Sequence, residues 1–219
     1  MSQDVKRGRF ITLEGGEGAG KSTQARLLAQ ALATRGIPVT LTREPGGTRG
    51  AEAIRTLLLD PGQDWSPRVD AMLFAAARGD HVAKLIEPAL ADGEWVVCDR
   101  YVDSSRAYQA GHSTVEGTLE DGDVMALHGI GSQGLMPDIT FLLEAESEAV
   151  QARLLARDGN DSDRIGGRDA AYHATVAARF RELAASDPGR IVRVDASGSV
   201  EDVHARIMQA MAAHVGERG

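Results

Sequence analysis

The sequence predicts an α/β protein in which helices cover a five-stranded parallel sheet, and three observations support this prediction. Five short apolar runs of the kind that form buried strands alternate with longer stretches whose apolar residues recur at helical spacing. A glycine-rich loop separates the first run from the first stretch. The 219 residues contain no internal repeat and no low-complexity linker, so we expect a single domain over residues 1–219 with a mobile lid at about 149–168.

The first half of the chain predicts two strands, each followed by a helix, at residues 10–13, 22–35, 37–41 and 51–59. The first run, Phe10-Ile-Thr-Leu13, is largely apolar and precedes the glycines. The first helix has its apolar residues at helical spacing and ends before Gly36, since glycine commonly terminates helices. Turn-forming residues at 44–47 and 60–62 flank the second helix.

The second half predicts, in order, a helical stretch at 68–91, a strand at 95–98, a helix at about 124–129, a strand at 139–143, a helix at 170–185, a strand at 190–194 and a helix from about residue 200. The run 95–98 is apolar throughout and ends at Asp99, which is typical of a strand buried on both faces whose carboxyl end reaches a site. The last helix places Val203, Ile207 and Met211 on one face. Strands that alternate with helices in this way indicate a parallel sheet.

Composition and charge argue against several classes of partner. The formal net charge is −8 and the basic residues form no dense block, so we expect no nucleic-acid polymer as a partner. No apolar run approaches the roughly 20 residues of a membrane-spanning helix, so we expect no membrane association. The single cysteine, Cys98, cannot form an internal disulfide and no apolar signal segment begins the chain, so we predict a cytoplasmic protein.

The segment Gly15-Gly-Glu-Gly-Ala-Gly-Lys21-Ser22 fits the phosphate-loop pattern G-x-x-x-x-G-K-[ST] and lies between a predicted strand and a predicted helix. The glycines allow successive N–H groups to face a phosphate, and Lys21 can reach the terminal phosphates as a catalytic residue. A turn that only joined strand to helix would need neither Lys21 nor Ser22. The predicted ATP-binding residues are Gly15, Gly16, Glu17, Gly18, Ala19, Gly20, Lys21, Ser22 and Thr23.

An acid and an arginine follow the strand at 95–98. Sites in parallel sheets form outside the carboxyl ends of the strands, so Ser22 and Asp99 are the predicted Mg²⁺ ligands, partly through water. Arg100 is a predicted catalytic residue, because its guanidinium can clamp a phosphoryl oxygen and stabilise the charge that builds up during transfer. A strand-end cap and a surface ion pair are the simpler alternatives. Cys98 is expected to be a core residue.

Other residues indicate a second, acceptor substrate. Asn160 is the only asparagine and no lysine follows it, which argues against the guanine-reading motif of a GTP switch. Phe74 and Arg78 share one face of a predicted helix and offer a flat apolar surface beside a planar donor, as a nucleobase requires, although core packing explains Phe74 equally well. A carboxylate inside an anion-binding loop repels phosphates, so we expect Glu17 to face an acceptor hydroxyl instead.

The chain resembles the bacterial thymidylate kinases over about residues 8–215. The resemblance rests on motifs that occur in the order of that family, beyond the phosphate loop. They are Thr42-Arg-Glu-Pro-Gly-Gly-Thr48, Ile54-Arg-Thr-Leu-Leu-Leu59, Leu73-Phe-Ala-Ala-Ala-Arg78, Asp99-Arg-Tyr-Val-Asp-Ser-Ser105, Ala107-Tyr-Gln109 and Pro137-Asp-Ile-Thr140. The resemblance implies a P-loop nucleoside-monophosphate-kinase fold, a homodimer, and Mg²⁺-dependent transfer of the γ-phosphoryl group of ATP to dTMP.

The resemblance also implies where the base of dTMP binds. Phe74 would stack on thymine and Arg78 would bond to the edge of the ring, with Ser105 and Gln109 near the base. The complete set of implied dTMP-binding residues is Glu17, Glu44, Arg55, Phe74, Arg78, Arg100, Ser105, Tyr108 and Gln109.

The remaining members of this set would bind the sugar and the phosphate of dTMP. Tyr108 would lie where a ribose would carry its 2′-hydroxyl, and Glu17 would approach the 3′-hydroxyl. Arg55 and Arg100 would hold the acceptor phosphate, with Glu44 nearby.

The catalytic arginine of the family lies either in the phosphate loop or in the lid. The loop contains no arginine here, so the chain resembles the lid-arginine type, with Arg153, Arg157 and Arg164 as predicted catalytic residues; solvated helix charges are the alternative for each. The chain departs from the family pattern at Gly166, where an acid commonly follows Asp-Arg-Ile, and at Glu144, where an Asp is typical.

A monophosphate is largely dianionic near neutral pH and is already a nucleophile, so no strong general base is needed. The six histidines show no metal-binding spacing. The alternatives to a dTMP kinase are another phosphate-loop kinase of small molecules or nucleoside monophosphates, and a regulatory ATPase that acts as a switch. Phosphorylation of different acceptors distinguishes the kinases, and hydrolysis that is independent of any acceptor would indicate the switch.

Overall fold

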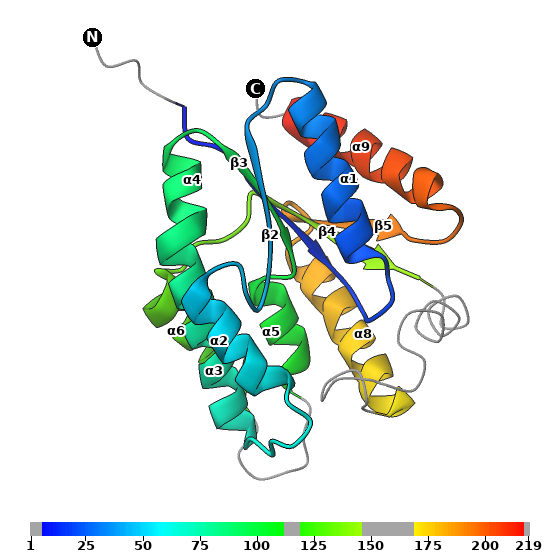
Figure 1. The fold of residues 1–219 in the computed structure, drawn as a ribbon. Helices are drawn as coiled ribbons and strands as arrows, with labels where there is room; N and C mark the ends of the chain where they lie inside the picture. Colours follow the sequence, from blue (N-terminus) through cyan, green and yellow to red (C-terminus); the bar gives the residue numbers. More distant parts are fainter. Residues whose placement is uncertain (1–5, 112–118, 146–168, 217–219) are drawn as a thin grey trace.

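Five parallel strands form the centre of the molecule and lie in the order β2-β3-β1-β4-β5 (Figure 1). The computed structural model describes residues 6–111, 119–145 and 169–216. The strands are β1 (Phe10–Glu14), β2 (Val39–Arg43), β3 (Trp95–Asp99), β4 (Ile139–Glu144) and β5 (Ile191–Asp195). The predicted five-stranded parallel sheet is therefore confirmed, whereas the predicted lid at about 149–168 lies outside the described residues.

Strand β2 begins two residues later than the predicted span of 37–41. Pro38 has no N–H and cannot donate to a neighbouring strand, so the ladder begins at Val39, which pairs with Trp95 of β3. The carbonyl of Pro38 still accepts a hydrogen bond from the Trp95 N–H at 2.8 Å. The shift moves the end of the strand to Arg43, directly before the turn that carries Glu44.

The helices are α1 (Lys21–Thr34), α2 (Arg49–Leu59), α3 (Pro67–His81), the π-helix η1 (Val82–Ile86), α4 (Glu87–Ala91), α5 (Val102–Tyr108), α6 (Asp121–Ser132), α8 (Ala170–Ser186) and α9 (Val200–Gly216). The stretch predicted at 68–91 is helical throughout, but its hydrogen bonding changes from α turns to π turns at η1. Pro88 explains the interruption, because it cannot donate to the carbonyl of Lys84 and its ring would collide with that carbonyl in an α-helix.

Two helices depart further from the sequence expectation. Helix α6 is longer than the predicted 124–129 because a capping box begins it: the Asp123 carboxylate accepts from the Glu120 N–H at 2.9 Å. The sequence predicts no helix at α5, which has seven residues and receives no hydrogen bond from a capping side chain of its own at Tyr101. The helix depends on contacts with distant residues, described below.

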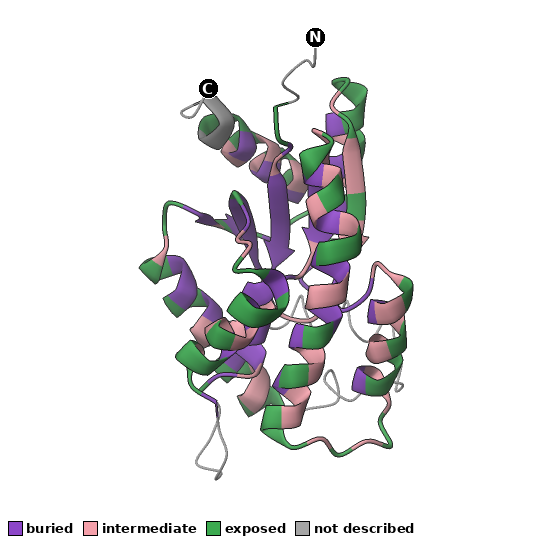
Figure 2. Cartoon of the chain, turned by 90° about the vertical axis from the view of Figure 1, so that its left-hand side faces the viewer, coloured by how far each residue is buried: buried purple, intermediate pink, exposed green. Residues whose placement is uncertain are grey.

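The sheet is covered on both faces, which gives three layers. Alternate strand residues point to opposite faces. Ile11 and Leu13 belong to the apolar cluster shared with α1 and α9, whereas Phe10 belongs to the cluster shared with η1 and α4. Helix α8 packs on β5 on the same side as α4 (Figure 1). Figure 2 shows the buried strands at the centre and the exposed residues on the outer sides of the helices. Among the described helices, none combines the length and apolarity needed to cross a bilayer.

The strand order determines where the functional side chains gather. The carboxyl ends of β2, β3 and β1 lie next to one another, with Arg43 paired to Asp99 and Leu13 paired to Asp99 in register. The phosphate loop follows β1, Arg100 follows β3, and Glu44 follows β2. In open parallel sheets, ligands bind at this edge, where the strand order reverses.

Candidate active site

The segment that follows β1 has the backbone conformation of a phosphate loop. Gly15, Gly18 and Gly20 adopt φ angles of 136°, 69° and 92°, which glycine tolerates and other residues rarely adopt. A Cβ atom on Gly15 would lie 2.4 Å from the carbonyl oxygen of Leu143 in β4. Helix α1 begins directly after the loop, so its free N–H groups face the space that the loop encloses.

Lys21 lies inside this loop and is only 6% exposed. Its ammonium group donates to the carbonyl of Gly16 at 2.6 Å. Burial, and to a smaller extent repulsion from Arg100, lowers the pKa of Lys21 to about 8, although Glu17 and Asp99 oppose the shift. A polyphosphate bound in the loop would favour the charged form of this lysine.

Ser22 and Asp99 form a pair of oxygen ligands at the end of the loop. The Ser22 hydroxyl donates to Oδ2 of Asp99. The other carboxylate oxygen, Oδ1, is buried and has no hydrogen-bond partner among the described residues. In that part of the chain, three or more acidic, His or Cys side chains nowhere gather as a metal cluster. A pair of hard oxygen donors with one unpaired oxygen fits Mg²⁺, which usually binds through one or two protein groups, phosphates and water.

Arg100 links the phosphate loop to α5. Its backbone has a φ angle of 69°, which is unusual for a residue with a side chain and is typical of functional sites. Its Nη1 donates to the carbonyl of Gly15 at 3.1 Å and to the hydroxyl of Ser104 at 3.0 Å. Its Nη2 forms an ion pair with Glu17. Glu17, within the loop, therefore lies against Arg100 at the wall of the cavity described below.

A cavity of about 560 Å³ joins the phosphate loop to the helices α3 and α5. Its lining includes residues predicted for both substrates. They are Glu17, Gly18, Gly20, Lys21, Ser22, Thr23, Glu44, Arg55, Phe74, Arg78, Asp99, Arg100, Ser105, Tyr108 and Gln109, together with Arg43, Pro45, Leu59, Tyr101 and Ser104. Phe74 is half-buried and lines this cavity, so it is available for a ligand. Gln109 contributes a buried amide oxygen without a partner among the described residues.

Arg78 is fixed by groups on three sides and is only 3% exposed. Its Nε donates to Glu44 at 2.8 Å, and its Nη2 donates to the hydroxyl of Ser105 at 2.8 Å and to the carbonyl of Tyr101 at 3.4 Å. A guanidinium held in this way keeps one orientation toward the cavity, and a planar fork in a fixed orientation suits the edge of a base.

A buried histidine contacts the carboxylate that holds this arginine. His81 is fully buried, and its Nδ1 lies 3.1 Å from Oε1 of Glu44. Its Nε2 lies 2.8 Å from the hydroxyl of Thr42. The histidine therefore orients the carboxylate that in turn holds Arg78. The sequence analysis gave His81 no role, because its partners come from β2 and from the turn after it.

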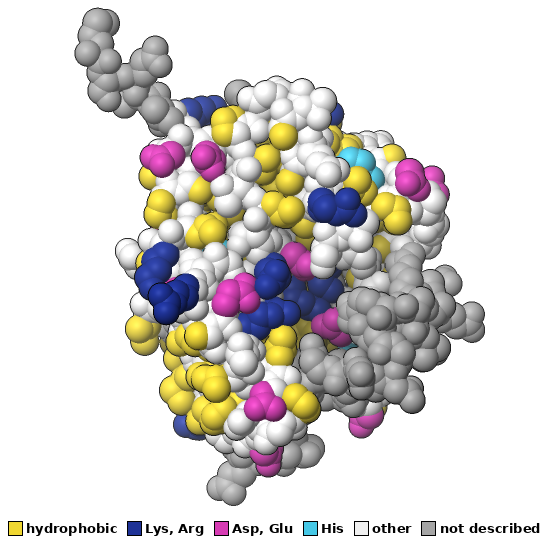
Figure 3. Space-filling model, viewed as in Figure 1, with side chains coloured by type: hydrophobic (Ala, Val, Ile, Leu, Met, Phe, Trp, Pro, Cys, Tyr) yellow, Lys and Arg dark blue, Asp and Glu magenta, His cyan; other side chains and the backbone are white. Residues whose placement is uncertain are grey.

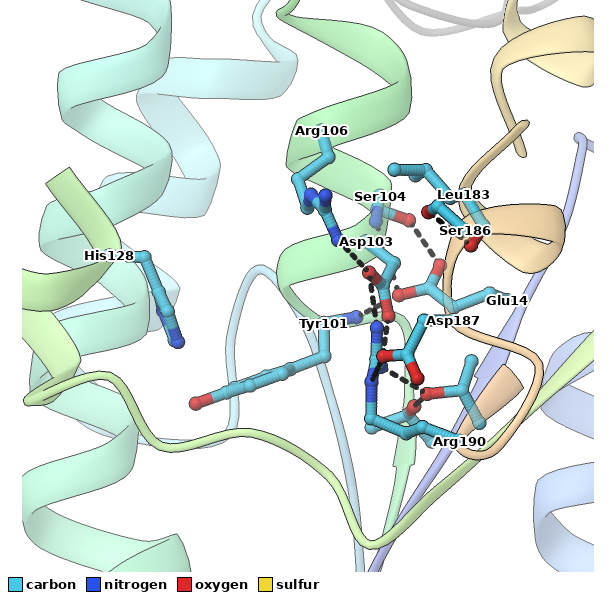
Figure 4. A network of polar contacts seen from close by, with 12 residues as sticks. Glu14, Tyr101, Asp103, Ser104, Arg106, His128, Leu183, Ser186, Asp187 and Arg190 are labelled. Atoms are coloured by element: carbon cyan, nitrogen blue, oxygen red, sulfur yellow. Dashed lines mark hydrogen bonds and ion pairs between the residues drawn. The ribbon is translucent and has the colours of Figure 1, made fainter. Parts of the chain in front are cut away.

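Glu14 is a buried acid that the sequence analysis also missed. It is 1% exposed, and burial, together with the nearby Asp103, raises its pKa to about 7. Its carboxylate accepts hydrogen bonds from the N–H of Tyr101 and from the N–H and hydroxyl of Ser104 (Figure 4). A signal was present in the sequence, because an acid ends a largely apolar strand directly before the phosphate loop.

Asp103 links the first turn of α5 to the residue directly before β5. Arg190 donates to it through two nitrogens, at 2.6 and 3.1 Å, and Arg106 donates at 3.2 Å (Figure 4). Asp103 is 1% exposed, so this charge is almost fully removed from water. Such pairing is what a buried carboxylate requires. Arg190 precedes β5, so the short helix α5 is tied to both β1 and the start of β5.

The structure describes part of the remaining predicted set. Arg55 donates to the carbonyl of Pro45 at 2.8 Å at the edge of the cavity. The hydroxyl of Tyr108 lies 3.4 Å from Nη2 of Arg100. The predicted lid arginines, which are Arg153, Arg157 and Arg164, lie outside the described residues. Figure 3 shows basic and acidic side chains gathered at a hollow in the middle of one face.

The family model described as thymidylate kinase matches residues 13–207. A thymidylate kinase from Rhizorhabdus wittichii is 53% identical over 206 residues, which cover 94% of this chain and 97% of that protein. One from Gluconobacter oxydans is 50% identical over 208 residues, with 94% of each chain covered. A crystal structure of thymidylate kinase from Ehrlichia chaffeensis gives a TM-score of 0.73 at 29% identity and covers 94% of this chain and 98% of that chain.

Proposed function

Because the chain belongs to the thymidylate kinase family, we propose that its cavity holds dTMP between α3 and α5 and holds the phosphates of ATP in the loop after β1. The chain is a nucleoside monophosphate kinase that phosphorylates dTMP to dTDP, with ATP as co-substrate. The observation that supports the site assignment is that the phosphate loop and the fixed pair Phe74 and Arg78 line one continuous cavity.

In this proposal the base of dTMP stacks on Phe74 and bonds to Arg78, and the unpaired amide oxygen of Gln109 accepts a further hydrogen bond. Arg55 and Arg100 hold the acceptor phosphate. Glu17, which pairs with Arg100, faces the 3′-hydroxyl of the sugar. This arrangement directs the acceptor phosphate toward the phosphate loop, as in-line transfer requires.

Catalysis then depends on positioning and on neutralisation of charge. The acceptor phosphate has a second pKa of about 6 and is largely dianionic at neutral pH, so its oxygen attacks the γ-phosphorus without a protein base, while the bond from that phosphorus to the β–γ bridging oxygen breaks and ADP leaves. Lys21 and Arg100 stabilise the charge that develops on the transferred group. The predicted lid arginines would add positive charge and exclude water, so that ATP is not hydrolysed.

Ser22 and Asp99 would hold Mg²⁺ at the end of the loop. When bound, the ion would neutralise part of the negative charge of the phosphates and so lower the repulsion toward the incoming nucleophile. The unpaired Oδ1 of Asp99 supports this assignment, because a buried carboxylate oxygen without a hydrogen bond is costly unless another group satisfies it.

We also propose a cytoplasmic homodimer. Leu57, Met72 and Ile130 are 45%, 49% and 83% exposed, and they belong to α2, α3 and α6, which pack side by side. Large exposed apolar side chains on neighbouring helices favour an interface between subunits. Size-exclusion chromatography with light scattering tests the dimer, and a monomer at micromolar concentration would contradict it. The single cysteine is buried and free, which suits a reducing compartment.

Phosphorylation of a panel of acceptors tests the function. Purified protein with MgATP is assayed against dTMP, dUMP, UMP, CMP, AMP and GMP, and we expect the highest kcat/KM for dTMP. A preference for a purine or cytosine nucleotide would contradict the substrate assignment. Hydrolysis of ATP at the same rate with and without acceptor would favour a regulatory ATPase instead.

A further inference from the structure

The first turn of α5 is held by a residue from another element. Tyr101 precedes the helix and its own side chain does not cap it. Oε1 of Glu14 accepts from the N–H of Tyr101 at 2.7 Å and from the N–H of Ser104 at 3.2 Å. Glu14 thus supplies, from the end of β1, the acceptor that the N-cap residue of a helix normally supplies with its own side chain.

The second oxygen of Glu14 sets the direction of the Ser104 hydroxyl. The hydroxyl donates to Oε2 of Glu14 at 2.6 Å, and Nη1 of Arg100 donates to the same hydroxyl at 3.0 Å. A serine hydroxyl has one proton, so donation to the carboxylate leaves its lone pairs to accept from the guanidinium. Glu14, Ser104 and Arg100 therefore form one hydrogen-bonded chain, and Figure 4 shows the Glu14 carboxylate pointing at the start of α5.

We infer that Glu14 is a positioning residue for the acceptor: it fixes the start of α5 and the Arg100 side chain relative to the phosphate loop. Arg100 also donates to the carbonyl of Gly15, the residue next to Glu14. Displacement of the first turn would therefore move Arg100 away from the loop and shift Ser105, which lies in the same helix. This inference rests on the proposed assignment of acceptor binding to Arg100 and α5.

The chemistry of the contacts explains why a carboxylate stands at this position. Three donors converge on Glu14, and the two oxygens of an ionised carboxylate accept all three without donating any proton themselves. A glutamine of the same size would keep Oε1 on the two N–H groups and would turn its own N–H toward Ser104. The serine hydroxyl would then lose the acceptor that orients it, and its bond to Arg100 would lose the support of a charge.

Steady-state kinetics of two variants test the inference. We expect Glu14→Gln to raise the KM for dTMP about 10-fold while the KM for ATP stays within about twofold, since the backbone of the phosphate loop is untouched. Ser104→Ala keeps the cap on Tyr101 but cuts the link to Arg100, so we expect a smaller rise in the same constant. The double variant should show less than the product of the two effects, because both substitutions break the same chain.

Two further variants serve as controls. Thr12→Val changes a buried polar residue of the same strand, whose hydroxyl contacts Thr140 at 2.8 Å, and should leave both KM values unchanged. Gln109→Ala removes a proposed contact with the base and should raise the KM for dTMP. If Gln109→Ala leaves that KM unchanged, or if the unmodified protein does not phosphorylate dTMP, the proposed acceptor site fails and the inference falls with it.

If Gln109→Ala behaves as expected, the result depends on Glu14 alone. Equal rises in the KM for dTMP and for ATP in Glu14→Gln, or no rise in either variant, would overturn the inference. Should Glu14→Gln fail to fold, Ser104→Ala decides the question, because it removes a single half-buried hydroxyl and leaves the cap in place. An unchanged KM for dTMP in a folded Ser104→Ala protein would then overturn it.

Discussion

The buried ion pair between Arg78 and Glu44 allows a stability prediction that is independent of any assay of activity. The two side chains are 3% and 4% exposed and are joined at 2.8 Å. Arg78→Met keeps most of the apolar stem but removes the cationic partner of a buried carboxylate. Loss of one partner of a buried pair costs about 3–5 kcal/mol. For a chain of 219 residues, this corresponds to a fall in Tm of about 6–20 °C.

A second substitution tests whether the buried charge causes the loss. In Arg78→Met with Glu44→Gln the unpaired charge is gone, and the glutamine carbonyl can still accept from Nδ1 of His81, which lies 3.1 Å from Glu44 in the native protein. We expect the double variant to recover about half of the lost stability. Recovery is incomplete because the bonds of Arg78 to Ser105 and Tyr101 stay broken.

Urea unfolding followed by circular dichroism measures the free energy of unfolding of each variant, without nucleotides, because bound ligand would add its own stabilisation. The slope m should stay constant across the set. A double variant as unstable as Arg78→Met alone would refute the assignment of the loss to a buried charge. An Arg78→Met protein as stable as the parent would refute the larger claim that the pair is shielded from water.

Three further predictions concern the loop and its surroundings. Gly15→Ala should lose at least about 2 kcal/mol of stability in urea unfolding, because its Cβ would lie 2.4 Å from the carbonyl oxygen of Leu143, whereas Gly16→Ala, with open space at that position, should change little. The pKa of Lys21 is about 8 and bound phosphates favour its charged form, so binding of MgATP at pH 8 should take up about half a proton, whereas binding to Lys21→Arg should take up none. Calorimetry in two buffers of different ionisation enthalpy measures this proton uptake. Equal uptake by both proteins would contradict the prediction. Burial raises the pKa of Glu14 from 4.5 to about 7, so the protonated carboxyl contributes stability that is complete below pH 4.5 and is lost as the pH rises toward 7. The free energy of unfolding relative to Glu14→Gln should therefore fall by about 3 kcal/mol over that range. Parallel pH profiles of the two proteins would count against the buried carboxylate.

The sequence predicted the parts of the fold that depend on local pattern. Apolar runs located all five strands, and the phosphate-loop spacing located the first helix within one residue. The error at β2 came from Pro38, whose missing N–H delays the ladder even though the residue before it is apolar. Helix α5 was not predicted, because Glu14 and Arg190 support it and both lie far from it in the sequence.

The site was predictable where a side chain lines the cavity and not where it acts on another side chain. Phe74 and Arg78 were recognisable from a spacing of four residues. His81 and Glu14 were not, because their partners come from other strands and turns. Whether Phe74 packs in the core or faces a ligand depends on its surroundings, and the structure places it on the wall of the cavity. The sequence thus predicted residues that line the cavity and missed those that orient them.

The π turns of η1 determine which kinds of mutation this site can tolerate during evolution. A π turn contains about one residue more than the α turn it replaces, so α3 is rotated by about 100° relative to a helix without the insertion. Val82, Ile86 and Leu90 pack in the apolar cluster on the sheet, while Phe74 and Arg78, earlier in the same helical stretch, line the cavity. Substitutions that keep Pro88 leave this phase intact, whereas deletion of a single residue from η1 would turn the cavity-lining residues of α3 by about 100° relative to the residues that face the sheet. The orientation of α3 thus depends on how many residues η1 contains, and not only on which residues they are.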